Sequence, residues 1–188
     1  MPTQRIVFTA LAAALIAVGA YVAVPVGPVP VTLQTLFLIT VSLLGGLRIA
    51  LSASLLYLLM GAVGLPVFSG GTGGIAHFFS PTGGYLIGMV PAACIAGFFG
   101  DQASCFRNTS RTTWLIWALP GALLASLVIY MTGVPWLKAS LGITWAGAAA
   151  AGIIPFIIGD VLKIAASLAL AWIFSDRASL LLSAGRED

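Results

Sequence analysis

The stretch IIPFIIGDVLKI, residues 153–164, places an aspartate and a lysine in a segment that is otherwise apolar enough for the interior of a lipid bilayer. A charged residue at the centre of a membrane helix costs about 2.5 to 3.5 kcal/mol on insertion scales, so such residues usually face a bundle interior or a water-filled cavity. Asp160 and Lys163 are three residues apart, which puts them on one face of a helix. They can therefore contact one ligand, or each other.

The composition around this stretch is that of a membrane protein. Of 188 residues, 60% are hydrophobic and 7% are charged, and the mean hydropathy is +1.11. Segments 6–47 and 49–100 contain no Asp, Glu, Lys or Arg, and each is long enough for two crossings at about 20 residues per transmembrane helix. The net charge of +3 lies in ends and loops, where it indicates contact with anionic lipid; no nucleic-acid partner is expected.

Proline, glycine and charged residues divide the apolar segments into six expected transmembrane helices, which form one all-α domain over residues 1–188. The helices are expected at about 6–24, 31–46, 48–64, 83–100, 113–133 and 155–175. An even number of crossings places Lys138 on one side of the membrane and six arginines on the other. The six are Arg5, Arg48, Arg107, Arg111, Arg177 and Arg186. The positive-inside rule then predicts a multi-pass protein of the cell membrane with both termini in the cytoplasm.

The two longer external loops, residues 25–32 and 68–84, are uncharged and rich in proline and glycine. Irregular backbone at membrane depth is tolerated only where it is buried in protein or lines a cavity. The second loop is long and carries Phe68, Phe78 and Phe79. We therefore expect it to act as a lid over a cavity, in preference to a plain surface turn.

The charged pair follows an expected break in the last helix. A continuous helix from Trp145 to Phe174 would be about 45 Å long, well beyond a hydrocarbon core of about 30 Å, and Pro155 is the natural place for it to break. Three roles remain open for the pair: a self-neutralising ion pair, proton coupling through Asp160, and a ligand site. We favour the ligand site, because burying an ion pair for stability alone is often no better than an apolar replacement. Lys163 would attract a carboxylate, and the aspartate would accept hydrogen bonds from N–H groups.

Other function classes lack the residues that they need. Neither lysine lies in a G-x-x-x-x-G-K-[ST] loop, so the chain cannot hydrolyse ATP through a Walker site. One histidine and two distant cysteines do not make a usual zinc site, and we expect no metal or cofactor. An intramembrane hydrolase would have to pair His77 with Ser69 or Ser80, but the sequence offers no glycine before "FSG" and no group to orient the imidazole. A lone loop histidine more often lines a pocket.

Small residues recur at a spacing of four in the first expected helix. Ala10 pairs with Ala14, and Ala13 pairs with Ala17. Such a pattern lets a second helix approach closely in lipid, where no hydrophobic force drives helices together. Packing inside this chain and docking of an external partner helix both remain open.

Four motifs together resemble one family. They are VPVTLQTL (29–36), YLLMGAVGLPVFSGGTGG (57–74), SPTGGYLIG (80–88) and PFIIGDVLK (155–163). In order and spacing they are similar to the BioY family, the biotin-binding S component of energy-coupling factor (ECF) transporters. The resemblance implies a six-helix bundle that captures biotin at the outer face and passes it to a transmembrane T component driven by two cytoplasmic ATPases. It also favours docking of that T component on Ala10, Ala14, Ala13 and Ala17.

The resemblance assigns ligand contacts residue by residue. They are Asp160, Lys163, Thr72, Tyr85 and Gln34. Thr72 stands where relatives often have asparagine, and the chain departs from the pattern at Leu86, where some relatives carry arginine, and at Ser80, where glycine is usual. Biotin combines a urea, an apolar bicycle and a carboxylate, which suits an apolar pocket with a few placed polar groups. We expect Lys163 to meet the acid and the other four residues to meet the urea.

Two further functions remain as alternatives. One is a stand-alone secondary transporter that uses Asp160 for ion coupling, and the other is an S component for a different vitamin. An intramembrane hydrolase is a weaker third possibility.

Overall fold

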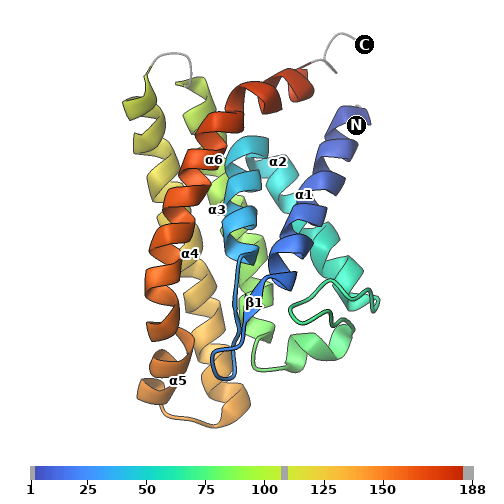
Figure 1. Cartoon of the computed structure of the whole chain (residues 1–188), viewed down its shortest axis with the longest axis vertical. Helices are drawn as coiled ribbons and strands as arrows, with labels where there is room; N and C mark the ends of the chain where they lie inside the picture. The colour runs from blue at the N-terminus through green and yellow to red at the C-terminus, as the bar shows by residue number, and fades with distance from the viewer. Residues whose placement is uncertain (1–2, 107–109, 184–188) are drawn as a thin grey trace.

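The computed structural model describes residues 3–106 and 110–183, which form a bundle of long helices (Figure 1). The helices are α1 (Thr3–Tyr21), α2 (Gln34–Ala62), α3 (Gly83–Cys105), α4 (Arg111–Leu141), α5 (Trp145–Gly152) and α6 (Ile157–Ser183). Two 3-10 turns lie at Ile75–Phe79 and Ile154–Phe156, and two short strands, β1 (Ala23–Val24) and β2 (Val31–Thr32), pair antiparallel. The predicted bundle of long apolar helices is confirmed in its mostly helical architecture.

Within the described residues, five helical segments are long and apolar enough to cross a membrane. They are Thr3–Tyr21, Gln34–Ala62, Gly83–Ser104, Arg111–Leu141 and Trp145–Ala178. The sequence predicted six, because it divided residues 31–64 into two helices. Helix α2 covers both, but it turns back on itself at its upper end in Figure 1, so that two arms run beside each other.

The turn in α2 lies at Gly46, whose φ of 72° and ψ of −179° are not helical. A Cβ atom at this position would lie 1.9 Å from Oδ1 of Asp101 on α3. The other oxygen of that carboxylate accepts a hydrogen bond from the backbone N–H of Leu47 at 2.9 Å. Glycine is therefore required twice, for the left-handed φ and for the space that Asp101 occupies while it caps the second arm.

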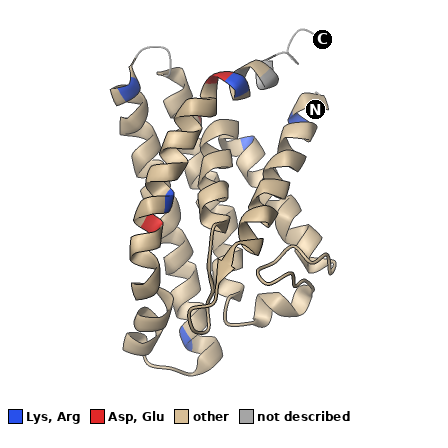
Figure 2. Ribbon diagram, viewed as in Figure 1, with Lys and Arg blue, Asp and Glu red and all other residues tan. Residues whose placement is uncertain are grey.

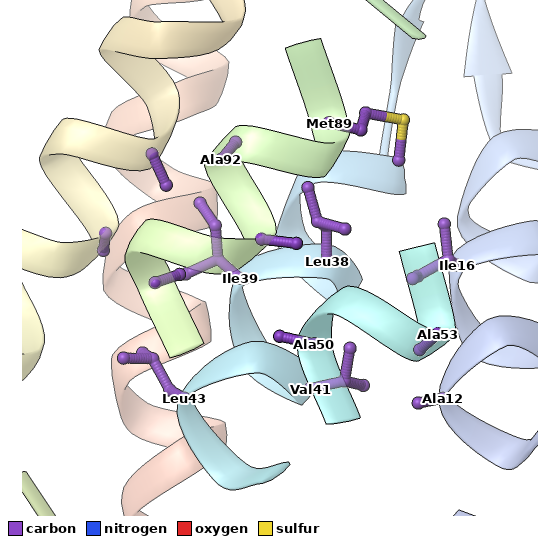
Figure 3. Close-up of a cluster of buried hydrophobic side chains, with 14 of the residues drawn as sticks. Ala12, Ile16, Leu38, Ile39, Val41, Leu43, Ala50, Ala53, Met89 and Ala92 are labelled. Carbon is purple, nitrogen blue, oxygen red and sulfur yellow. The ribbon is translucent and has the colours of Figure 1, made fainter. Parts of the chain in front are cut away.

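The core of the bundle is built from small side chains. Helix α3 lies between α2 and α4, and a Cβ at Gly97 would lie 2.8 Å from Cβ of Ala50 on the second arm of α2. In Figure 3, Leu38, Ala50 and Ala92 meet in one cluster from the first arm, the second arm and α3. Such close backbone approach is how helices associate in lipid, where van der Waals packing replaces the hydrophobic effect.

The last two expected helices differ from the prediction in their limits. The predicted break near Pro155 is confirmed, since α5 ends at Gly152 and α6 begins at Ile157. Helix α4, expected to end at residue 133, continues through Pro135 to Leu141 and stops at Gly142, which has a φ of 65°. Proline is tolerated inside membrane helices because neighbouring groups satisfy the freed backbone, so it did not end this one.

The charges follow the predicted asymmetry. The N-terminal end of α1 and the C-terminal end of α6 lie at the same end of the bundle, and most Lys and Arg positions gather there (Figure 2). Lys138 is in the last turn of α4, and α4 ends at the opposite end of the bundle (Figure 1). Arg107 and Arg186 lie outside the described residues. The orientation of the bundle in a membrane stays a prediction.

Candidate functional site

A cavity opens between the connectors and the helices, in the half of the bundle that lies away from the chain ends. The space inside it, counted out to the open mouth and therefore including open solvent, is about 780 Å³. The walls come from the α1–α2 connector (22–33), the α2–α3 connector (63–82) and helices α2, α3, α4 and α6. Four of the five predicted ligand residues lie on these walls: Gln34, Tyr85, Asp160 and Lys163.

The charged pair forms one wall of this cavity. Lys163 Nζ lies 3.0 Å from Asp160 Oδ1, and the two side chains are 8% and 18% exposed. Both therefore face the bundle, as the cost of a charge in lipid predicts. Asp160 sits in the first turn of α6, where the positive end of the helix dipole stabilises a carboxylate. The break at Pro155 thus creates the helix end on which the acid depends.

Tyr130 of α4 is a cavity residue that the sequence analysis missed. Its hydroxyl donates a hydrogen bond to Oδ2 of Asp160, so both carboxylate oxygens have a partner. A buried tyrosine hydroxyl normally finds a hydrogen-bond partner, and a tyrosine inside an apolar span was the available signal. Nothing in the sequence indicated which of the polar residues on other helices would meet it.

Gln34 begins α2 and is 8% exposed. Its amide nitrogen Nε2 donates to the Tyr57 hydroxyl at 3.0 Å and lies 2.9 Å from Sδ of Met89. Tyr57 is fully buried, and its own hydroxyl donates to the carbonyl of Val67 at 3.2 Å. This network joins the start of α2 to α3 and to the α2–α3 connector.

Tyr85 links α3 to α5 beside the cavity. Its hydroxyl donates to the carbonyl of Gly152 at 3.0 Å, where α5 ends. Its ring packs against α4, since a Cβ at Gly133 would lie 2.4 Å from Tyr85 Cδ1. The hydroxyl proton is therefore already donated, which leaves its lone pairs for any ligand.

The aromatic α2–α3 connector forms part of the cavity wall. Phe68 is fully buried and lines the cavity together with His77, and the two rings stack with centroids 5.4 Å apart. Phe78 packs against the core, and Phe79 is 73% exposed; neither belongs to the cavity wall. Tyr21 of α1 donates a hydrogen bond to the carbonyl of Pro66, which ties this connector to the bundle.

Thr72, the fifth predicted ligand residue, is not on the cavity wall. Its hydroxyl lies 3.0 Å from Nε2 of His77 and 2.9 Å from the carbonyl of Ser69. The expectation that nothing orients the imidazole is thus wrong, because Thr72 holds it. Ser80 donates to the backbone carbonyl of His77, and no hydrogen bond among the described residues joins Ser69 or Ser80 to the imidazole. The arrangement needed for a serine nucleophile is therefore missing from this loop.

The two alanine pairs of α1 point in different directions. Ala10 and Ala14 are exposed on the outer face of the helix. Ala13 is fully buried, and Ala17 packs against the hydrophobic core. The first pair is accessible to another helix, and the second packs inside the chain. Docking of a partner helix on Ala10 and Ala14 stays a prediction, whereas Ala13 is buried and Ala17 is only partly exposed.

Comparison with known proteins gives concordant matches. Residues 1–179 match the model of the BioY family. A probable biotin transporter BioY of Pyrococcus horikoshii is 37% identical over 171 residues, which cover 91% of this chain and 96% of that protein. The biotin transporter BioY of Rhizobium etli is 36% identical, with 87% and 88% covered. Among solved structures, the crystal structure of the S-component for biotin from an ECF-type ABC transporter aligns with a TM-score of 0.82 at 25% identity, over 92% of this chain and 91% of that one.

Proposed function

The chain belongs to the BioY family, and on that premise we propose that it is the S subunit of an ECF-type transporter, which binds biotin and releases it for uptake. Its role is transport and not catalysis. The observation that carries the proposal is the Lys163–Asp160 pair, whose side chains are 8% and 18% exposed, on the wall of an open cavity. A charge pair turned into an open, partly apolar cavity is suited to a small solute that carries an acid and an amide.

Both ends of biotin find chemical partners on this wall. The Lys163 ammonium has three donors and uses one on Asp160, so two remain for the ligand carboxylate. Gln34 lies on the cavity wall at the start of α2 and is a partner for the urea. Phe68, Ile129 and Phe156 give the apolar surface that the fused rings need. Thr72 is placed to act on the ligand only through His77.

We further propose that the chain crosses the membrane six times, with both ends in the cytoplasm. The reversal at Gly46 supports the sixth crossing, because it turns α2 into two arms beside each other. The gathering of Lys and Arg at the end that carries both termini supports the orientation. The cavity would then open toward the outer face of a bacterial cytoplasmic membrane, where the vitamin arrives.

Biotin binding is the first expected result. The purified protein in detergent should bind one biotin per chain in an equilibrium assay with labelled ligand. Excess unlabelled biotin should compete, whereas thiamine and riboflavin should not. Competition by another vitamin in place of biotin would contradict the ligand assignment and favour the alternative S component.

Dependence on partners separates an S subunit from a stand-alone transporter. Cells that lack their own biotin uptake should accumulate labelled biotin only when this chain is expressed with a T component and two ATPases. Equal uptake without the ATPases would favour a secondary transporter, with Asp160 as the coupling residue.

The exposed alanines of α1 give a test of docking. Replacing Ala10 and Ala14 by tryptophan should reduce ATP-driven uptake about fivefold or more, because overpacking a contact costs about 1 to 3 kcal/mol. Biotin affinity of the isolated protein should not change, since both side chains face away from the core. Ile116→Trp, at a position on α4 that is also exposed, is the matched control and should leave uptake intact. Equal loss in the control would contradict a specific docking face.

A further inference from the structure

The amide of Gln34 is held in one orientation by two neighbours. Its nitrogen lies 3.0 Å from the Tyr57 hydroxyl and 2.9 Å from Sδ of Met89. A thioether sulfur has no proton to give, so the atom that faces Met89 must be the donor. With the amide turned over, the carbonyl oxygen would face the sulfur, and two acceptors would be in contact.

Tyr57 imposes the same orientation independently. Its hydroxyl has a single proton, which it donates to the carbonyl of Val67 at 3.2 Å. Only lone pairs remain toward Gln34, and they require the N–H side of the amide. Both protons of the amide nitrogen are therefore directed at protein acceptors.

What Gln34 has left for the cavity is its carbonyl oxygen. Gln34 lies on the cavity wall, and among the hydrogen bonds of residues 3–106 and 110–183 none reaches its Oε1. Of the ligand groups available, only a donor can meet that oxygen. A ring N–H of a cyclic urea is such a donor, and a urea carbonyl is not.

We propose that Tyr57 is a positioning residue that, together with Met89, holds the Gln34 carbonyl toward the cavity and so makes the site selective for a ligand with a ring N–H. This inference rests on the proposed binding of biotin. Tyr57 does not touch the ligand, since it is fully buried and is not among the residues of the cavity wall. Its effect passes through Gln34.

Tyr57→Phe isolates the hydroxyl, because the ring keeps its edge-to-face contact with Phe68, whose centroid lies 5.6 Å away. The probes are biotin and two analogues that are methylated at one or the other urea nitrogen. The parent should reject one of these analogues strongly. In Tyr57→Phe the amide loses one of its two restraints, so biotin should bind about 3- to 10-fold more weakly, the range expected for one hydrogen bond. The preference for biotin over the rejected analogue should fall by a similar factor.

A double-mutant cycle tests that the effect passes through the amide. In a Gln34→Leu background the Tyr57→Phe change should alter biotin affinity by less than about twofold, because no amide remains to be oriented. Met89→Leu, which removes the sulfur and keeps the approximate volume, should also lower the preference for biotin over the analogue. It gives the same readout if Tyr57→Phe fails to fold.

Tyr21→Phe is the matched control. It removes another tyrosine hydroxyl that donates to the same connector, at Pro66, without touching Gln34. It should leave the preference for biotin unchanged. The inference is overturned if Tyr57→Phe prefers biotin over the methylated analogue as strongly as the parent does, or if Tyr21→Phe lowers this preference as much as Tyr57→Phe. It is also overturned if Tyr57→Phe weakens biotin binding in the Gln34→Leu background as much as it does in the parent. Absence of biotin binding by the parent itself would instead overturn the proposed function, and the inference with it.

Discussion

Lys163→Met is expected to weaken biotin binding by about 100-fold or more and to destabilise the protein. Removing one partner of a buried ion pair costs about 3 to 5 kcal/mol, because the other charge is left without compensation. Among the described residues, Asp160 would then keep the Tyr130 hydroxyl alone as a side-chain partner, in a site where the Asp160 side chain is 18% exposed. The ligand carboxylate would also lose the cation that we assign to it. Equilibrium binding and the thermal unfolding midpoint in detergent measure the two effects separately.

The double variant Asp160→Asn, Lys163→Met distinguishes a structural ion pair from a ligand contact. Both charges are then absent, so much of the lost stability should return. Biotin affinity should stay low, because neither the cation nor the carboxylate acceptor is restored. Lys138→Met, which removes a cation near the far end of α4, serves as the control and should bind as the parent does. Binding by the double variant as tight as that of the parent would leave the pair with a packing role only.

Gly46→Ala is expected to destabilise the bundle by about 3 to 5 kcal/mol. A φ of 72° with a ψ of −179° lies in a region that essentially only glycine adopts, and holding another residue there costs about 1 to 3 kcal/mol. The new Cβ would also lie 1.9 Å from Oδ1 of Asp101. Moving that carboxylate breaks its hydrogen bond to the Leu47 N–H, and hydrogen bonds to charged groups contribute about 1.5 to 3 kcal/mol. The unfolding midpoint in detergent should fall by roughly 10 °C.

Gly27→Ala is a matched control for the turn in α2. Gly27 has almost the same φ, 71°, but a Cβ there would meet nothing within 4 Å. The Gly27→Ala variant should lose only the stability that a Cβ costs at a positive φ, about 1 to 2 kcal/mol. Equal shifts of the midpoint at the two glycines would show that the contact with Asp101 adds nothing.

Much of the bundle was predictable because the relevant constraints act locally along the chain. A membrane core sets a helix length, so apolar segments between charged residues indicate the number and approximate place of spans. Pro155 ends a helix wherever it stands in the fold. Asp160 and Lys163 are three residues apart, and helix geometry alone brings them together on one face. The cost of a charge in lipid then turns that face toward the bundle.

Contacts between helices were not predictable in this way. Asp160 meets Tyr130 across 30 residues, and Gln34 meets Tyr57 and Met89 across 23 and 55 residues. Burial also separates the two alanine pairs of α1, which sequence spacing treats alike. These pairings depend on how the helices pack, and packing is a property of the whole bundle.

The sequence by itself determined that the chain is an apolar helical bundle with an ionic pair turned inward, since helix length, helix breaking and the cost of charge in lipid depend on neighbouring residues only. The tertiary structure decided which polar residues line the cavity and which partners they have. It joined Thr72 to His77, and it brought the amide nitrogen of Gln34 to Tyr57 and Met89. The physical reason is that a hydrogen bond forms only where donor and acceptor approach within about 3 Å, and packing of distant segments sets that distance.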